Sequence, residues 1–262
     1  MAWNKQYDIE KIEKVDEYLL KGILNTHSKS SSAGLYLELG CIPLRYVLKK
    51  RRIMYLHHIL NRNSKELIRK VYEAQKRAPV SGDWVQLVES DLQELNIDID
   101  ELKKMKKNRF KKKLKEKILR SSFLYLKNIA QTKSKINYLS YKKLQVQKYL
   151  VSLKFNIKEK ALLTKLRTRM IDVKNNSKNN YQNIMSCDLC GEFEDQKHLL
   201  NCKVLIENCE ALFNDSIVEY EDIFGTEIKQ LTAVRLYMKV LETREKLLKE
   251  LLTRGNLVQC TT

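Results

Sequence analysis

The segment CDLCGEFEDQKHLLNC (residues 187–202) gathers three cysteines and one histidine into a 16-residue window. The spacing Cys-x2-Cys-x7-His-x3-Cys is typical of a closed, four-ligand structural zinc site. Gly191 follows the second cysteine, where a tight knuckle often needs a positive φ. The letters KHLL that start at residue 197 predict a helix running through residue 202. The sequence therefore predicts a zinc site with the ligands Cys187, Cys190, His198 and Cys202.

The alternative is that these are ordinary buried cysteines beside an unrelated histidine. The chain has six cysteines in 262 residues, which is too few for a disulfide framework. Accidental clustering of four ligand-type residues is the weaker explanation, so zinc is favoured. Cys41, Cys209 and Cys260 lie outside the set, and Cys209 is expected in the core of a helical region.

The composition predicts an all-α fold, a multi-helix bundle with a small zinc knuckle and a long C-terminal helix. Only seven glycines and two prolines occur, and 43% of the residues are hydrophobic. No apolar run approaches the roughly 18 residues of a membrane-spanning helix. The charged N-terminus MAWNKQYDIEKIEK is unlike a signal peptide. We therefore expect a nuclear or cytoplasmic protein within a ribonucleoprotein, not a membrane protein.

Apolar periodicity and capping residues predict helices over 8–24, 33–39, 43–61, 64–77, 83–95, 98–130, 141–153, 157–173, 198–213 and 226–254. Gly255 is expected to end the last helix, whose broken heptad favours intramolecular packing and leaves homo-oligomerisation open. Two histidines in the third helix, His57 and His58, are expected to be structural. The domains predicted are a basic helical linker domain (1–173), a polar linker (174–186) and a knuckle with C-terminal helices (187–262).

The positive charge is concentrated before the C-terminal region. Residues 203–262 carry eight Lys and Arg against ten Asp and Glu, although the whole chain has a net charge of +18. The densest stretch, 103–120, has eleven basic residues and one carboxylate. These basic residues are Lys103, Lys104, Lys106, Lys107, Arg109, Lys111, Lys112, Lys113, Lys115, Lys117 and Arg120. A second cluster consists of Lys49, Lys50, Arg51 and Arg52.

Such density predicts binding to RNA or DNA, because lysines placed near phosphates release condensed counterions. A solvated helix face or a nuclear-localisation segment is the first alternative. A membrane surface is the second, and it is disfavoured because Met105, Phe110, Leu114 and Ile118 form only a narrow apolar stripe. The knuckle is expected to be a second, shorter contact for the nucleic acid.

The sequence lacks the usual catalytic motifs. It has no phosphate-binding Gly-rich loop, no nucleophile elbow, no His-Glu-x-x-His helix and no Asp-Asp dipeptide. The carboxylates Glu219, Glu221, Asp222 and Glu227 could form a two-metal site, but a solvated patch is the favoured interpretation.

Several segments resemble a known family. They are LYLELGCIPLRY (35–46), MYLHHILNRN (54–63), LIRKVYEAQK (67–76), GDWVQLVESDL (82–92) and the knuckle itself. Together they are similar to the region that follows the polymerase in the reverse transcriptases of non-LTR (LINE-like) retrotransposons. The resemblance covers most of the chain and implies a helical linker followed by a zinc knuckle on Cys187, Cys190, His198 and Cys202.

The polymerase fingers and palm of that family would lie before Met1, and no endonuclease is recognisable. The chain resembles a detached tail, so we expect no polymerase activity and a polymerase partner supplied elsewhere. Three hypotheses remain: a nucleic-acid-binding module, an unrecognised carboxylate-dependent nuclease, and a structural remnant that binds nothing.

Overall fold

The computed structural model describes residues 6–26, 30–137, 139, 141–173, 186–208 and 218–259. Within these ranges the chain is helical, and its only extended pairing is an isolated bridge between Ser186 and Phe193. The all-α prediction is therefore confirmed. The chain divides into two compact units, unit 1 (residues 1–21 and 32–146) and unit 2 (22–31 and 147–262). No helix in the described residues is long and apolar enough to cross a membrane.

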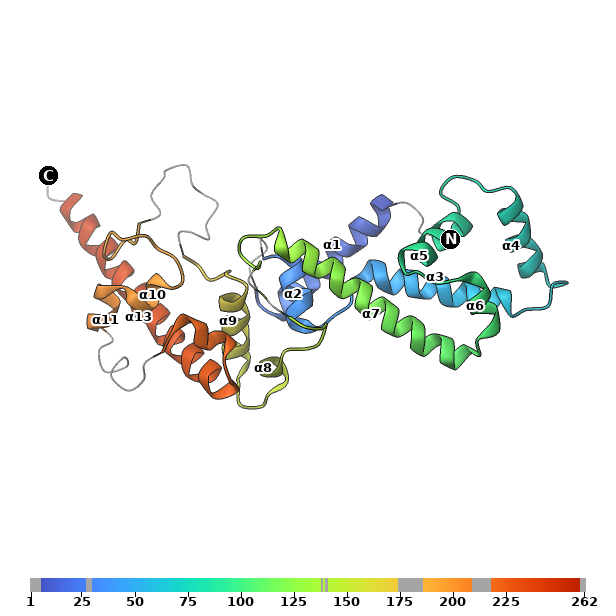
Figure 1. Cartoon of the computed structure of the whole chain (residues 1–262). Helices are drawn as coiled ribbons and strands as arrows, with labels where there is room; N and C mark the ends of the chain where they lie inside the picture. The colour runs from blue at the N-terminus through green and yellow to red at the C-terminus, as the bar shows by residue number, and fades with distance from the viewer. Residues whose placement is uncertain are drawn as a thin grey trace. The chain divides into compact units, whose positions relative to one another are not determined.

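The helices of the first part of the chain follow one another with short connections (Figure 1). They are α1 (Gln6–Ile23), α2 (Ser32–Leu39), α3 (Leu44–Leu60), α4 (Leu67–Arg77), α5 (Trp84–Glu94), α6 (Ile99–Lys104) and α7 (Lys107–Gln131). Asp83 caps α5, since its carboxylate accepts a hydrogen bond from Gln86 N at 2.8 Å.

The core of unit 1 lies where α3 packs against α5 and α7. Ile53 and Leu56 of α3 are fully buried, as are Leu114 and Ile118 of α7. The narrow apolar stripe of the basic segment is therefore the face that α7 turns toward the core. This burial leaves the opposite, lysine-rich face of α7 to solvent.

The predicted single helix over 98–130 is wrong, because the chain breaks between α6 and α7 at Met105 and Lys106. The buried ring of His57 lies 3.0 Å from the carbonyl oxygen of Met105 through Nε2 and stacks on Phe110 at 4.9 Å between ring centroids. The side chain of a distant helix thus satisfies a carbonyl at the break. His57 has the structural role expected of it.

The segment LYLELGCIPLRY is built into the core of unit 1. Leu35, Tyr36 and Leu37 are buried, and the buried carboxylate of Glu38 accepts a hydrogen bond from the hydroxyl of Tyr141. Arg45 pairs with Glu13 through two guanidinium nitrogens, at 2.8 and 2.5 Å. Through these contacts the segment stabilises the fold of unit 1.

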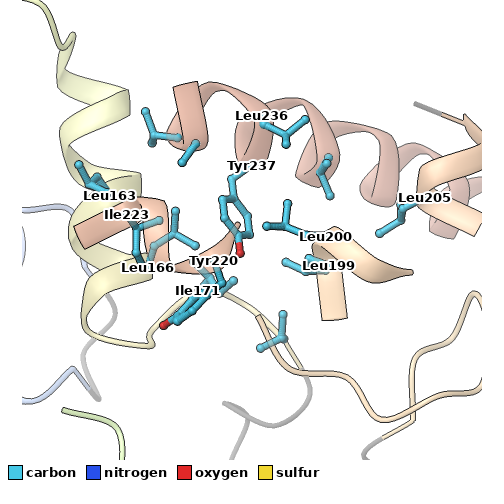
Figure 2. Close-up of a cluster of buried hydrophobic side chains, with 14 of the residues drawn as sticks. Leu163, Leu166, Ile171, Leu199, Leu200, Leu205, Tyr220, Ile223, Leu236 and Tyr237 are labelled. Atoms are coloured by element: carbon cyan, nitrogen blue, oxygen red, sulfur yellow. The ribbon is translucent and has the colours of Figure 1, made fainter. Parts of the chain in front are cut away.

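Unit 2 contains α8 (Lys148–Val151), α9 (Ile157–Arg167), α10 (His198–Asn201), α11 (Lys203–Asn208), the 3-10 helix η2 (Tyr220–Phe224) and α13 (Glu227–Gln259). Its core gathers apolar side chains from all of these elements. Figure 2 shows Tyr237 of α13 at the centre of this cluster, among Leu199, Leu200 and Tyr220. The long C-terminal helix therefore carries one wall of the core.

Several boundaries differ from the predictions. The two units divide between residues 146 and 147 rather than at the predicted linker 174–186, of which 174–185 lie outside the described residues. The reason is that α9 contributes Leu163 and Leu166 to the same core as α13. Gly255 does not end α13, which continues to Gln259, because one glycine weakens a helix by only about 1 kcal/mol.

The helix predicted over 141–153 is mostly absent, and only α8 is helical there. Residues 145 and 146 pass directly against Gly40 instead. The helix predicted over 157–173 ends at Arg167, and Arg169 takes a positive φ of 50°. The expected core residue Cys209 lies outside the described residues.

Candidate metal centre and nucleic-acid interface

The first half of the knuckle is a tight turn around Cys187 and Cys190. The amide of Gly191 donates to the carbonyl of Cys187 at 2.8 Å, and the amide of Cys187 donates to the carbonyl of Glu192 at 2.6 Å. Gly191 has the positive φ that its position predicted, 80°. The bridge from Ser186 to Phe193 closes the turn. This backbone points both thiols toward the segment that carries the remaining ligands.

The second half of the knuckle is the short helix α10. Its first residue, His198, is held by a hydrogen bond from its amide to the side chain of Asp195 at 2.8 Å. The helix predicted to run through residue 202 ends at Asn201, and Cys202 follows it in an extended conformation before α11 begins at Lys203. The potential ligand atoms of Cys187, Cys190, His198 and Cys202 all lie within 4.8 Å of one another, and His198 Nε2 lies 3.3 Å from Cys190 Sγ. The four residues can hold a metal ion.

The chemistry of this donor set fits a structural metal. Cys187 and Cys202 are buried, and His198 is only 8% exposed. Burial, together with the neighbouring thiols of Cys190 and Cys187, raises the pKa of Cys202 to about 12. A bound cation favours the thiolate forms of such a cluster. Four protein ligands leave no position for a substrate, so the centre would support the fold rather than catalyse a reaction.

Two contacts attach the knuckle to α13. Glu194 is fully buried and accepts hydrogen bonds from Arg244 at 2.9 and 2.6 Å. The hydroxyl of Tyr237 donates to the carbonyl of Gln196 at 2.9 Å. These partners were not identified from the sequence, since nothing in the spacing distinguishes Glu194 from its acidic neighbours.

The surface of the knuckle is acidic. Between Cys187 and Cys202 the chain has four carboxylates and one lysine, and Asp188 and Glu192 are exposed. The lysine, Lys197, is paired with Glu221 at 2.8 Å. A negatively charged surface repels phosphates, so the charge of the knuckle does not favour the second nucleic-acid contact expected there.

Most basic residues of 103–120 project from α7 into solvent. Within the described part of the chain, a subset of them is exposed and forms no ion pair. This subset, which we term the α7 basic face, consists of Lys107, Arg109, Lys111, Lys112, Lys115 and Arg120. Lys104 and Lys106, in and just after α6, are also exposed, and Lys113 is half-buried.

Lys103 and Lys117 of the same segment have structural partners. Lys103 pairs with Asp100 at 3.1 Å. Lys117 donates to the carbonyl oxygens of Leu95, at 3.3 Å, and Asn96, where α5 ends. A lysine at this position neutralises the negative end of the helix dipole. Lys117 therefore contributes to the fold of unit 1.

The second basic cluster divides into an inner and an outer pair. Arg52 forms a two-nitrogen ion pair with the buried Asp91, at 2.7 and 3.0 Å, and Lys49 pairs with Glu94. Lys49 and Arg52 thus join α3 to α5. Lys50 is half-buried, and Arg51 is exposed.

Three of the four carboxylates considered for a two-metal site, Glu221, Asp222 and Glu227, pair with lysines. Asp222 pairs with Lys229 at 2.9 Å, and Glu227 pairs with Lys154 at 3.0 Å. Hydrogen bonds from Lys229 and Lys197 lower the pKa values of Asp222 and Glu221, respectively. In the described ranges, the only cluster suited to a metal is the knuckle.

Comparisons with protein-family models, with curated proteins and with solved structures found no match to this chain.

Proposed function

We propose that this chain is a non-catalytic nucleic-acid-binding protein in which unit 1 holds RNA or DNA and a zinc ion stabilises unit 2. The observation that carries the proposal is the α7 basic face. The helix turns Phe110, Leu114 and Ile118 into the core and presents the residues of the α7 basic face, which form no ion pair among the described residues, to solvent.

The electrostatics of unit 1 support this proposal. Residues 32–146 carry 27 Lys and Arg against 11 Asp and Glu, which is nearly all of the excess charge of the chain. The stretch of α7 from Lys107 to Arg120 is about 20 Å long, so several phosphates can lie along it at once. Each phosphate that is neutralised releases condensed counterions.

We propose zinc as the metal because of the ligands that the knuckle offers. Three thiolates and one imidazole at knuckle spacing are the donors that structural zinc prefers. Chain segments similar to the post-polymerase region of non-LTR reverse transcriptases also favour zinc and nucleic acid. We therefore also propose that the chain is related to the post-polymerase region of non-LTR reverse transcriptases. In this proposal, another protein or domain supplies the polymerase.

Two alternatives predict different results. A carboxylate-dependent nuclease would cleave RNA or plasmid DNA when magnesium is added, but pairing of Asp222 and Glu227 with lysines disfavours it. A structural remnant would neither cleave nor bind nucleic acid.

The test is the binding of a labelled 20-nucleotide RNA and of the matching DNA across a salt series, with and without magnesium. We expect binding without cleavage and a steep loss of affinity as salt rises. Magnesium-dependent cleavage would support the nuclease, and an absence of binding at low salt would support the remnant.

A further inference from the structure

A stripe of cationic and aromatic side chains lies on the solvent-facing side of α3. Arg51, Tyr55 and His58 are spaced four and three residues apart, so they share one helical face, and Arg62 continues the stripe just beyond the helix. Arg51 and His58 are exposed, and Tyr55 is 48% exposed. We refer to these four residues as the α3 stripe.

The tyrosine ring of the stripe packs against other aromatic rings. Trp84, the first residue of α5, meets Tyr55 edge-on at 5.5 Å between ring centroids, and the buried Tyr72 meets Trp84 in the same manner at 6.5 Å. The ring of His58 lies nearly parallel to that of Tyr55, at 6.4 Å and 17°. Tyr55 thus rests on an aromatic support while half of its surface remains accessible.

The cations at the two ends of the stripe differ from the inner pair of the same helix. Lys49 and Arg52 form ion pairs with carboxylates of α5, whereas Arg51 is exposed to solvent. Arg62 has 48% of its side chain exposed, donates to His58 Nε2 at 3.3 Å and has only a distant partner in Glu66, at 3.9 Å. An exposed aromatic ring between two cations is complementary to a base joined to its phosphates.

We infer that the α3 stripe is a stacking platform for unpaired bases, so that the ligand of unit 1 is single-stranded nucleic acid. The inference rests on the proposed function and adds the class of nucleic acid to it. Every base has a π-face that can stack on Tyr55, but in a duplex those faces are already occupied by neighbouring base pairs. The α7 basic face attracts the phosphates of single strands and of duplexes alike. The α3 stripe favours single strands, because only their bases are free to stack.

Fluorescence of Trp84 tests this inference directly. The chain has two tryptophans, so a Trp3→Phe variant leaves Trp84 as the only reporter beside Tyr55. A 15-nucleotide oligo-U and a 15-base-pair duplex are titrated into this variant at fixed salt. We expect the single strand to quench the emission and to bind at least about fivefold more tightly than the duplex.

Substitutions at Tyr55 separate stacking from packing. Tyr55→Phe keeps the ring and should bind oligo-U like the parent. Tyr55→Leu keeps apolar volume and should lose about fivefold or more in oligo-U affinity, with unchanged duplex affinity and salt slope. Tyr18→Leu, at a 75% exposed tyrosine of α1, is the matched control and should have no effect. Equal melting temperatures establish that the variants are folded.

Failure of the inference is distinguishable from failure of the proposed function. Oligo-U binding that neither quenches Trp84 nor distinguishes Tyr55→Leu from Tyr55→Phe would overturn the stacking platform. If that binding still depends on the lysines of α7, the proposed function remains supported. If neither oligonucleotide binds to the parent, both are overturned.

Discussion

A single glycine controls how closely two segments of unit 1 approach. Gly40 has a φ of 62°, and a β-carbon at this position would lie 2.6 Å from the α-carbon of Gln145. Gly40→Ala combines left-handed strain with overlap against backbone, so we expect a loss of at least about 3 kcal/mol of unfolding free energy. Chemical denaturation measures this loss.

Gly82 provides the matched control. Its φ is 78°, but a β-carbon there would meet nothing within 4 Å. Gly82→Ala should therefore cost only the backbone strain, about 1–2 kcal/mol. Equal losses for the two variants would show that the approach of residue 145 does not explain Gly40.

The ligand cysteines give a second prediction at the scale of single residues. The purified protein should contain about one zinc per chain, and cobalt should replace it with thiolate charge-transfer and tetrahedral d–d absorption. Cys202→Ser should lose most of the metal, because a three-ligand site holds it poorly. Cys41→Ser, outside the cluster, should retain it. A protein that unfolds identically with and without a strong chelator would contradict the site.

The helices α3 and α5 are joined by ion pairs from only part of the basic cluster 49–52. Lys49 and Arg52 pair with carboxylates of α5, whereas Arg51 is exposed. Arg52→Gln leaves the buried Asp91 with only Lys49, at 3.9 Å, and should lower the unfolding free energy by about 2–4 kcal/mol. Arg51→Gln, at the neighbouring exposed position, should change it by no more than about 0.5 kcal/mol. Denaturation of both variants tests this difference, and a stable Arg52→Gln protein would contradict it.

The ion pair between Arg244 and Glu194 is one of the two polar contacts described above that attach the knuckle to α13. Arg244→Gln would remove the guanidinium group that pairs with the fully buried carboxylate of Glu194. We expect a loss of about 3 kcal/mol and faster release of the metal to a chelator. Lys249→Gln removes an exposed ion pair of the same helix, with Glu245, and should leave the unfolding free energy nearly unchanged because solvent screens that pair. Equal metal release from the two variants would contradict this role of Arg244.

The sequence predicted the existence of the elements more successfully than their ends. Periodicity located the main helices and ligand spacing located the knuckle, because both are local properties of the chain. The break between α6 and α7 was missed because the side chain that contacts the Met105 carbonyl there, His57, lies 48 residues earlier in the chain. The partners of Lys49 and Arg52 on α5 were missed for the same reason. Local sequence patterns do not predict contacts between segments that are distant in the chain.

At the scale of the whole molecule, charge and metal are divided between the two units. Unit 1 contains the α7 basic face and the α3 stripe, whereas the knuckle in unit 2 is acidic. The composition of 174–182 predicted a boundary there, but burial of Leu163 and Leu166 beside α13 places α9 with the knuckle. We propose that unit 1 binds nucleic acid and that zinc stabilises unit 2.

The most direct test of this account compares the salt dependence of nucleic-acid binding in two variants that lose the same charge. One changes Lys107, Lys111, Lys112 and Lys115 of α7 to Gln. The other changes four exposed lysines of unit 2, Lys158, Lys203, Lys239 and Lys246, to Gln. Both should keep their zinc and their melting temperature.

We expect the α7 variant to flatten the log–log salt slope by one unit or more, because each lost phosphate contact removes about 0.7–0.9 units. The unit 2 variant should bind with nearly the slope of the parent. Equal slopes for the parent and the α7 variant, or equal losses in the two variants, would contradict binding through the α7 basic face.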